Sequence, residues 1–134
     1  MAIDYGRKRV GIAVTDENKI IASALTTVHS KDVLTFLQDY FKNQQVECVV
    51  VGEPKQMSGE DSEVTPQINT FIRQFQKQFP AMTLKRFDER FTSSLAKQAL
   101  IESGLKKKQR QQKELVDMTS AVIILQSYME QLGH

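Results

Sequence analysis

The order of strand-like and helix-like segments is the feature that most constrains the fold of this chain. Three strand patterns come first, and they predict an antiparallel meander. Helix and strand patterns then alternate, and a strand–helix–strand connection within one sheet makes its two strands parallel, with a right-handed crossover. The sequence therefore predicts an α/β fold in which the first, fourth and fifth strands run parallel.

Apolar spacing gives the expected bounds of these elements. The expected strands are Ala2–Ile3, Val10–Thr15, Ile20–Val28, Val46–Val51 and Met82–Phe87. The fourth is a β-branched run without alternation, which is typical of a strand covered on both faces. The expected helices run from Ser30 to Gln44, Thr65 to Phe79, Thr92 to Gly104 and Leu115 to Leu132, the first three beginning at their N-caps. The segment from Gly52 to Ser62 is expected to be a loop.

The composition is that of one ordinary globular domain, which we expect to span residues 1–134. A chain of 134 residues with 40% hydrophobic and 25% charged residues is able to bury a core without disulfides. The single cysteine, Cys48, is expected in the core, as suits a reducing cytosol. No apolar stretch is long enough to span a bilayer and no signal segment is evident, so we expect a cytoplasmic protein.

Acidic residues follow the strands that we expect to run parallel. Asp4 ends the first strand, Glu53 follows the fourth, and Asp88 and Glu89 end the fifth. The carboxyl ends of parallel strands meet at one edge of a sheet, where ligands of α/β proteins usually bind. We therefore expect these carboxylates to lie close together. In isolation, Asp4 would be interpreted simply as a turn residue of a hairpin.

Asp117 is a further candidate, because it is acidic near the start of a helix that otherwise packs on the core. An acid that is favoured by the helix dipole is the alternative interpretation. Carboxylates gathered without histidine or cysteine suit Mg²⁺ or Mn²⁺, which prefer oxygen ligands. Zinc is disfavoured because His29 and His134 are isolated in the sequence and Cys48 is expected in the core.

Basic residues are clustered, although the formal net charge of the chain is only +2. One cluster, residues 7–9, directly follows Asp4, and the other, residues 106–113, lies in a glutamine-rich connector before the last helix. A local basic face is able to bind the phosphates of a nucleic acid even when the average charge is small. A solvated loop is the alternative interpretation of each cluster.

Four motifs follow one another along the chain. They are Ile3-Asp4-Tyr5-Gly6 with Arg9-Val10-Gly11-Ile12-Ala13, Val51-Gly52-x-Pro54 with Met57-x-Gly59, Asp88-Glu89-Arg90-Phe91-Thr92, and Val116-Asp117-x-x-Ser120-Ala121. Together they resemble the YqgF (RuvX) family, over nearly the whole chain. The resemblance implies an RNase-H-like fold, with a five-stranded mixed sheet in the order 3-2-1-4-5, strand 2 antiparallel, flanked by helices. It also implies a metal-dependent nuclease, since members are described as candidate nucleases for the 5′ end of pre-16S rRNA and as candidate Holliday-junction resolvases.

The resemblance also implies roles for individual residues. Carried over by motif, the catalytic and metal-binding acids are Asp4, Glu89 and Asp117. The implied mechanism uses two Mg²⁺ or Mn²⁺ ions roughly 3.5–4 Å apart, with Asp4 shared between them. The residues expected to hold the nucleic acid are Arg7, Lys8, Arg90, Lys106, Lys107 and Lys108.

The chain departs from the family pattern in two places. Members usually have a few more residues before the Asp4 motif, so the central strand is expected to be short or the start to be truncated. Position 53, often apolar in the family, is Glu53 here. Glu53 and Asp88 are auxiliary candidates for the site, and we interpret Glu53 as an incidental charge.

Other hypotheses remain open from the sequence. A branched DNA substrate would suggest a symmetric homodimer, although no segment indicates an interface. The opening hairpin also resembles the phosphate-binding start of sugar kinases and actin-like ATPases, which need two such domains where this chain provides one. The third hypothesis is a non-catalytic nucleic-acid-binding factor, in which the basic residues bind the nucleic acid and the acids have no catalytic role.

Overall fold

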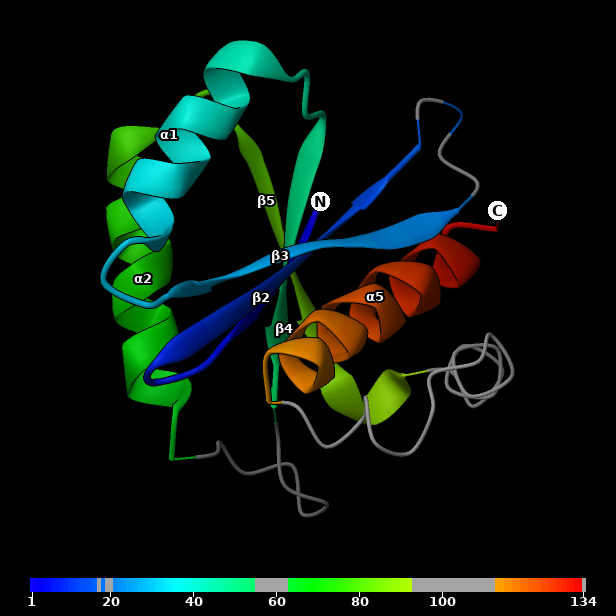
Figure 1. Cartoon of the computed structure of the whole chain (residues 1–134). Coiled ribbons are helices and arrows are strands. Elements are labelled where there is room, and N and C mark those ends of the chain that lie inside the picture. The colour runs from blue at the N-terminus through cyan, green and yellow to red at the C-terminus, as the bar shows by residue number, and fades with distance from the viewer. Residues whose placement is uncertain (17, 19–20, 55–62, 93–112, 134) are drawn as a thin grey trace.

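One five-stranded sheet lies at the centre of the protein (Figure 1). The computed structural model describes residues 1–16, 18, 21–54, 63–92 and 113–133, with the backbone alone for residues 113–118. The strands are β1 (Ala2–Tyr5), β2 (Arg9–Thr15), β3 (Ala22–His29), β4 (Cys48–Glu53) and β5 (Thr83–Asp88). Their order across the sheet is β3-β2-β1-β4-β5. Because β2 pairs antiparallel with β1 and β3, while β4 pairs parallel with β1 and β5, the predicted topology is confirmed.

Helices cover both faces of this sheet. Figure 1 shows α1 (Val33–Asn43) and α2 (Thr65–Gln78) side by side on one face, and α5 (Lys113–Gln131) across the other. A short 3₁₀ turn, η1 (Glu89–Phe91), directly follows β5. No helix in the described part of the chain is both long enough and apolar enough to span a membrane.

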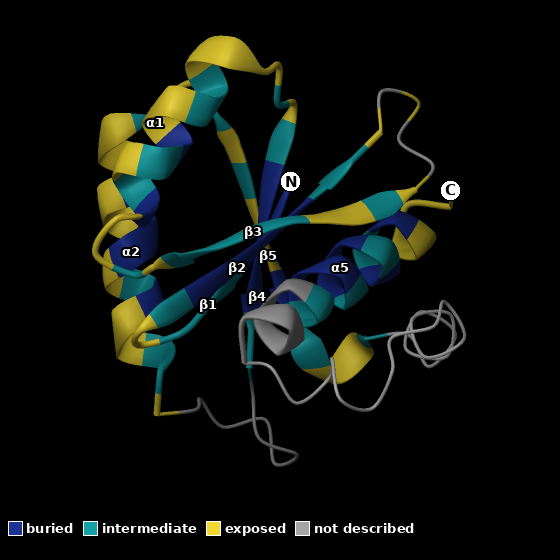
Figure 2. Ribbon diagram, in the orientation of Figure 1, coloured by how far each residue is buried: buried dark blue, intermediate teal, exposed yellow. Residues whose placement is uncertain are grey.

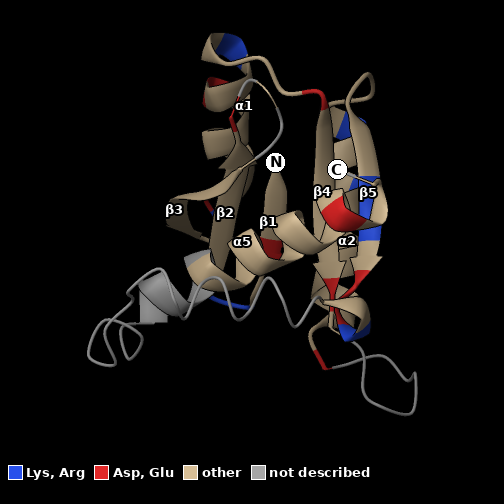
Figure 3. Cartoon of the chain, turned by 90° about the vertical axis from the view of Figure 1, so that its right-hand side faces the viewer, with Lys and Arg blue, Asp and Glu red and all other residues tan. Residues whose placement is uncertain are grey.

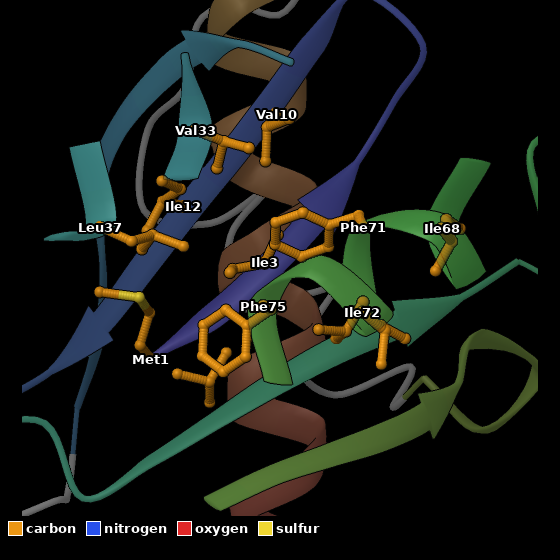
Figure 4. Packing of buried hydrophobic residues seen from close by; sticks show 12 residues of the cluster. Met1, Ile3, Val10, Ile12, Val33, Leu37, Ile68, Phe71, Ile72 and Phe75 are labelled. Carbon is orange, nitrogen blue, oxygen red and sulfur yellow. The ribbon is translucent and has the colours of Figure 1, made fainter. Parts of the chain in front are cut away.

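Large apolar side chains fill the space between the sheet and α1 and α2. Figure 4 shows Ile3 and Ile12 of the central strands meeting Leu37 of α1, together with Phe71 and Phe75 of α2. The α2 positions recur at helical spacing, so one stripe of the helix faces the sheet and is buried. Burial of each such side chain contributes about 1.5–3 kcal/mol to stability. This face therefore holds the larger part of the core.

Smaller residues line the face beneath α5. Ala2 and Ala13 of the neighbouring strands pack against Ala121 and Ile124 of the helix, and all four are almost fully buried. The short side chains allow the helix to approach the sheet closely. Figure 2 shows the resulting contrast along α5, whose inner side is buried and whose C-terminal end is exposed.

The bounds of β4 differ from those expected. The strand begins at Cys48 rather than Val46, and it continues through Gly52 to Glu53, where a loop was expected. Cys48 was expected in the core, but it is only half-buried and packs beside the α5 cluster. Cys48 at the start of β4, and Gly52 and Glu53 at its end, therefore have defined positions on the sheet.

The N-cap that was expected for α1 is wrong. Asp32, and not Ser30, occupies the N-cap position of this helix. The Ser30 hydroxyl instead donates a hydrogen bond to the Arg7 carbonyl at 2.7 Å, and its backbone N–H donates to the Lys8 carbonyl at 3.0 Å. Ser30 therefore ties the β1–β2 turn to the chain that enters α1.

Two other expected caps also differ. The N-cap of α2 is Val64, so Thr65 is the first helical residue. Thr92 ends η1, because its backbone N–H donates to the Glu89 carbonyl at 3.2 Å. The helix expected after Thr92 and the basic connector that follows it lie outside the described residues.

Candidate active site

The carboxyl ends of β1, β4 and β5 lie at one edge of the sheet, as predicted. Ile3 of β1 is in register with Val51 of β4, and Glu53 of β4 is in register with Asp88 of β5. Figure 3 shows acidic segments at the lower ends of β4 and β5. Successive side chains of a strand point to opposite faces, so the acids at this edge divide between the two faces.

Asp4 lies on the face of the sheet that α5 covers. Ala2, two residues earlier, belongs to the cluster beneath α5, and side chains two apart on a strand share a face. Tyr5 points to the opposite face, where its ring stacks on Phe71 of α2 with centroids 4.9 Å apart. This stack fixes the end of β1 and with it the direction of the Asp4 side chain.

The Glu89 carboxylate lies in a strongly perturbed environment. Its Oε2 is buried and has no hydrogen-bond partner within the part of the chain that the structure describes. The pKa of Glu89 is raised from 4.5 to about 7, mainly because the carboxyl group is buried and secondly because Asp4 and Asp88 carry negative charges nearby. Such a carboxylate needs either a proton or a cation to compensate its charge.

Gly52 makes room for the Glu89 carboxyl group. A β-carbon at position 52 would lie 2.6 Å from the Ile124 Cδ1 atom and 3.2 Å from the Glu89 Oε2 atom. Any other residue would therefore displace the helix side chain, the carboxylate or both. The sequence pattern predicts a loop at Gly52 and therefore gives no indication of this role. The available signal was the valine run before it, which continues as a strand and puts positions 50 and 52 on one face.

Asp88 and Arg90 fix the turn that carries Glu89. The Asp88 Oδ1 atom accepts a hydrogen bond from the backbone N–H of Arg90 at 2.9 Å. The same carboxylate accepts three further hydrogen bonds from the Arg90 guanidinium, with lengths between 2.7 and 3.1 Å. Arg90 was expected to hold a phosphate, and here it is paired with Asp88. Both residues therefore act on the position of Glu89 in this structure.

Glu53 lies on the other face of the sheet. It forms an ion pair with Arg86 of β5, and Arg86 in turn donates a hydrogen bond to Asn69 of α2 at 2.7 Å. Glu53 therefore points toward α2, across the sheet from Asp4 and Glu89. This geometry favours the interpretation of Glu53 as incidental to the metal site.

The basic β1–β2 turn borders the same depression as the acids. The depression has a volume of about 780 Å³, and Asp4 and Glu89 line it together with Arg7, Lys8 and Arg9. Arg7 and Lys8 are exposed, whereas Arg9 is half-buried. The arrangement places positive charge beside the acids, where a phosphate diester would need it.

The backbone of this turn is held at both ends. The Gly6 N–H donates to the Arg9 carbonyl at 3.0 Å, and a β-carbon on Gly6 would lie only 2.6 Å from that oxygen. Ser30 holds the middle of the turn through the Arg7 carbonyl, as described above. The Arg7 guanidinium lies 3.5 Å from an exposed Glu63 carboxylate, a contact of little energetic weight. The backbone of the turn is thus held while the Arg7 and Lys8 side chains remain accessible.

The remaining predicted site residues are only partly described. Asp117 lies near the start of α5, but its side chain is outside the described residues. Lys106, Lys107 and Lys108 lie outside them altogether. The structure therefore brings together Asp4 and Glu89, with Arg7 and Lys8 at the border of their depression.

The described part of the site fits a hard divalent cation. Its donors are carboxylate oxygens, one of them buried without a partner, and two negative charges stand close enough to raise a pKa. Oxygen donors of this kind are those that Mg²⁺ and Mn²⁺ prefer. Among the described residues, no group of three or more acidic, histidine or cysteine side chains is placed so that it could hold a metal ion.

The sheet order and the acids at its edge define an α/β protein of the RNase-H-like class. A family model described as "RuvX: Holliday junction resolvase" matches residues 1–131. A relative in Flavobacterium psychrophilum is 57% identical over 96% of this chain and 94% of its own length. Relatives in Christiangramia forsetii (54% identical; 96% of each chain) and Bacteroides fragilis (53%; 97% of this chain, 94% of the relative) are similar.

Each of these three relatives carries the name "Putative pre-16S rRNA nuclease". The chain belongs to the RuvX family, because the family model and the relatives both cover nearly all of it. The resemblance drawn from the four sequence motifs is therefore confirmed.

Proposed function

We propose that this protein is a nuclease that hydrolyses phosphodiester bonds and that it matures the 5′ end of pre-16S rRNA. The observation that carries the proposal is the depression in which Asp4 and Glu89 lie beside the basic turn of Arg7 and Lys8. Acids that crowd one another next to exposed cations suit a phosphate substrate, and they do not suit a neutral one. The names of the relatives support the choice of RNA.

We further propose that Asp4, Glu89 and Asp117 hold Mg²⁺ or Mn²⁺. The partnerless Glu89 oxygen and its raised pKa support this assignment, since a bound cation would remove both features. When bound, such an ion stabilises the developing charge on the phosphate and lowers the pKa of a water molecule.

The other residues of the site bind the substrate or position the Glu89 carboxylate. Arg7 and Lys8 contact backbone phosphates on one side of the acids, and Lys106, Lys107 and Lys108 are proposed to contact them on the other. Asp88 and Arg90 hold the η1 turn, so the Glu89 carboxylate is oriented before substrate arrives. An rRNA substrate implies that the protein acts in the bacterial cytoplasm.

A four-way DNA junction is the alternative substrate, and the description of the family as Holliday junction resolvases favours it. Symmetric cleavage of a junction requires two active sites related by a two-fold axis, so this alternative implies a homodimer. Single-site cleavage of an RNA extension makes no such demand on the protein. A monomer under conditions of cleavage would therefore count against the junction, whereas a dimer would be compatible with either substrate.

The test is cleavage of a 5′-extended pre-16S transcript and, in parallel, of a four-way DNA junction, each with Mg²⁺. We expect the wild-type protein to shorten the RNA and Asp4→Asn to abolish that activity, while Glu53→Gln retains it as the matched control. Undiminished cleavage by Asp4→Asn would contradict the proposed site. Cleavage of the junction alone would contradict the RNA substrate, and RNA binding without cleavage in either metal would indicate a non-catalytic factor.

A further inference from the structure

Phe91 is an exposed aromatic residue two positions after Glu89. Its exposed fraction is 62%, and the other large apolar residues that the structure describes as exposed are Ile21 and Leu132. Leu132 lies beside Met1 and Cys48, at the edge where β1 and β4 begin. Phe91 shares the η1 turn with Glu89, and its exposure shows that core packing does not account for its position.

The backbone that presents the Phe91 ring is held on both sides. Before the ring, the Asp88 carboxylate binds both the backbone and the side chain of Arg90. After it, the backbone N–H and the hydroxyl of Thr92 both donate to the Glu89 carbonyl, at 3.2 and 3.0 Å. The same η1 turn thus fixes the Glu89 carboxylate and the Phe91 ring relative to each other.

A guanidinium accompanies the ring. The Arg90 Cζ atom lies 5.9 Å from the centroid of the Phe91 ring, within the range of a cation–π contact. An exposed aromatic ring has the chemistry that binds a nucleobase, because the face of the ring stacks on the base. The Arg90 guanidinium, which is paired with Asp88, helps to hold the ring in place. A base inside a duplex is already stacked on both faces, so only an unpaired base can use such a ring.

We propose that Phe91 is a stacking platform for an unpaired nucleobase next to the bond that is cut, so that the site selects single-stranded over duplex nucleic acid. The proposal rests on the proposed function in one respect, namely that the substrate is a nucleic acid. It adds a residue that sets which strand conformation enters the site. A base stacked on Phe91 would be held by the same short turn that carries Glu89.

The first test uses fluorescence and requires no cleavage. The chain contains no tryptophan, so Phe91→Trp introduces a single reporter, and Leu132→Trp gives a matched control at a similarly exposed site. With EDTA present, a short single-stranded RNA of mixed sequence is expected to quench the emission of Phe91→Trp and to leave that of Leu132→Trp unchanged. The same RNA annealed as a duplex is expected to quench more weakly. Equal quenching of both variants, or equal quenching by duplex and single strand, would overturn the proposal.

A single-stranded DNA of the same sequence forms a further arm of this titration. Stacking involves the base and not the sugar, so quenching of Phe91→Trp by DNA as well as RNA is expected. Quenching by neither strand would contradict the platform.

The second test separates binding from chemistry. Phe91→Ala is expected to raise the KM for a substrate with an unpaired cleavage site roughly 5- to 100-fold, the range for loss of one base–aromatic stack. The kcat should change little, Phe91→Trp should restore the KM, and Phe91→Leu, apolar but without a ring face, should not. Rescue by Phe91→Leu, or an unchanged KM in Phe91→Ala, would overturn the proposal.

The fluorescence result does not depend on the proposed active site. Quenching in EDTA is measured without cleavage, so it stands even if Asp4→Asn proves fully active and the proposed function fails. Conversely, a cleaving enzyme whose KM ignores Phe91 would contradict the platform and leave the nuclease intact.

Discussion

The two faces of the sheet differ in the size of the side chains that they present to the helices. Beneath α1 and α2, the strands present large side chains such as Ile3 and Ile12, which pack on Phe75. Beneath α5, they present Ala2 and Gly52, and the second of these leaves space for a carboxylate. One face maximises buried apolar area, while the other gives up side-chain volume next to charged oxygens. The comparison indicates that stability resides mainly on the first face and chemistry on the second.

Strand alternation decides which acids share the second face. Asp4 points toward α5, whereas Tyr5 points toward α2 and anchors the strand end. On β4, Gly52 faces α5 and Glu53 faces α2, where Arg86 neutralises it. An acid at the correct edge of the sheet therefore joins the site only if its register also gives it the correct face.

Removing one acid from each face should produce the largest contrast. Glu89→Gln is expected to lower kcat about 1000-fold, the effect of losing several kcal/mol of charge stabilisation in the transition state. Glu53→Gln removes a partly exposed ion pair and should change kcat by no more than about threefold. Steady-state cleavage of the RNA substrate measures both. Comparable losses in the two variants would mean that the faces are not functionally distinct.

A large deletion on the α2 face should affect stability and spare the chemistry. Phe75 is fully buried between α2 and the sheet, so Phe75→Ala is expected to reduce the free energy of unfolding by about 3–5 kcal/mol. Denaturant unfolding measures that loss. The kcat per folded molecule, determined well below the melting temperature, should stay within about twofold of wild type. A matching fall in kcat would show that this face also positions the acids.

Adding volume at Gly52 should mainly lower kcat, whereas Phe75→Ala mainly lowers stability. The backbone at this position does not require glycine, so the effect of Gly52→Ala comes from contact with Ile124 and Glu89. Ile124 is able to rotate away, and we expect a fall in kcat of about 10-fold as Glu89 shifts, with a larger fall for Gly52→Val. The control is Val51→Ala on the other face, which should destabilise by roughly 2 kcal/mol and leave kcat unchanged. A fully active Gly52→Val enzyme would contradict the role of Gly52.

The smallest predicted effect is a pH dependence of stability in the absence of metal. The pKa of Glu89 is raised in the folded state, so the folded protein binds this proton more tightly than the unfolded chain does. The contribution of Glu89 to stability should therefore be greatest below pH 4.5, decline as the pH rises through the interval to about 7, and stay low above it. Partial exposure of the side chain limits the decline to about 2 kcal/mol.

Denaturant unfolding in EDTA at about pH 5 and about pH 8 measures this decline. Glu89→Gln should remove most of the difference, and Mg²⁺ added to the wild type should restore stability at the higher pH. Glu53→Gln should retain the full decline. An identical pH profile in the wild type and Glu89→Gln would contradict the raised pKa.

Much of the fold was predictable because its determinants are local in sequence. The meander and the parallel strands follow from hydrophobic spacing and from the rule for strand–helix–strand connections, the family resemblance implied the strand order, and the structure confirms both. The proximity of Asp4 and Glu89 follows from the same topology, because parallel strands end at one edge.

The roles of Ser30 and Gly52 could not be obtained in this way. Ser30 has good N-cap chemistry, but a tertiary partner, the Arg7 carbonyl, binds its hydroxyl instead. The role of Gly52 depends on the last residues of β4, since a shift of one residue at the strand end reverses the face of each side chain. Strand ends are where sequence patterns are weakest, and here they decide which residues touch the site.

The central claim is that the acids on the α5 face bind a divalent cation and that Glu53 does not take part. Calorimetric titration of Mg²⁺ and Mn²⁺ into the wild type, Glu89→Gln and Glu53→Gln tests it most directly. We predict that Glu89→Gln weakens binding roughly 10- to 100-fold, because binding strength follows the number of charged ligands. Glu53→Gln should bind the metal as the wild type does. Wild-type affinity in Glu89→Gln, or a loss in Glu53→Gln alone, would contradict the account.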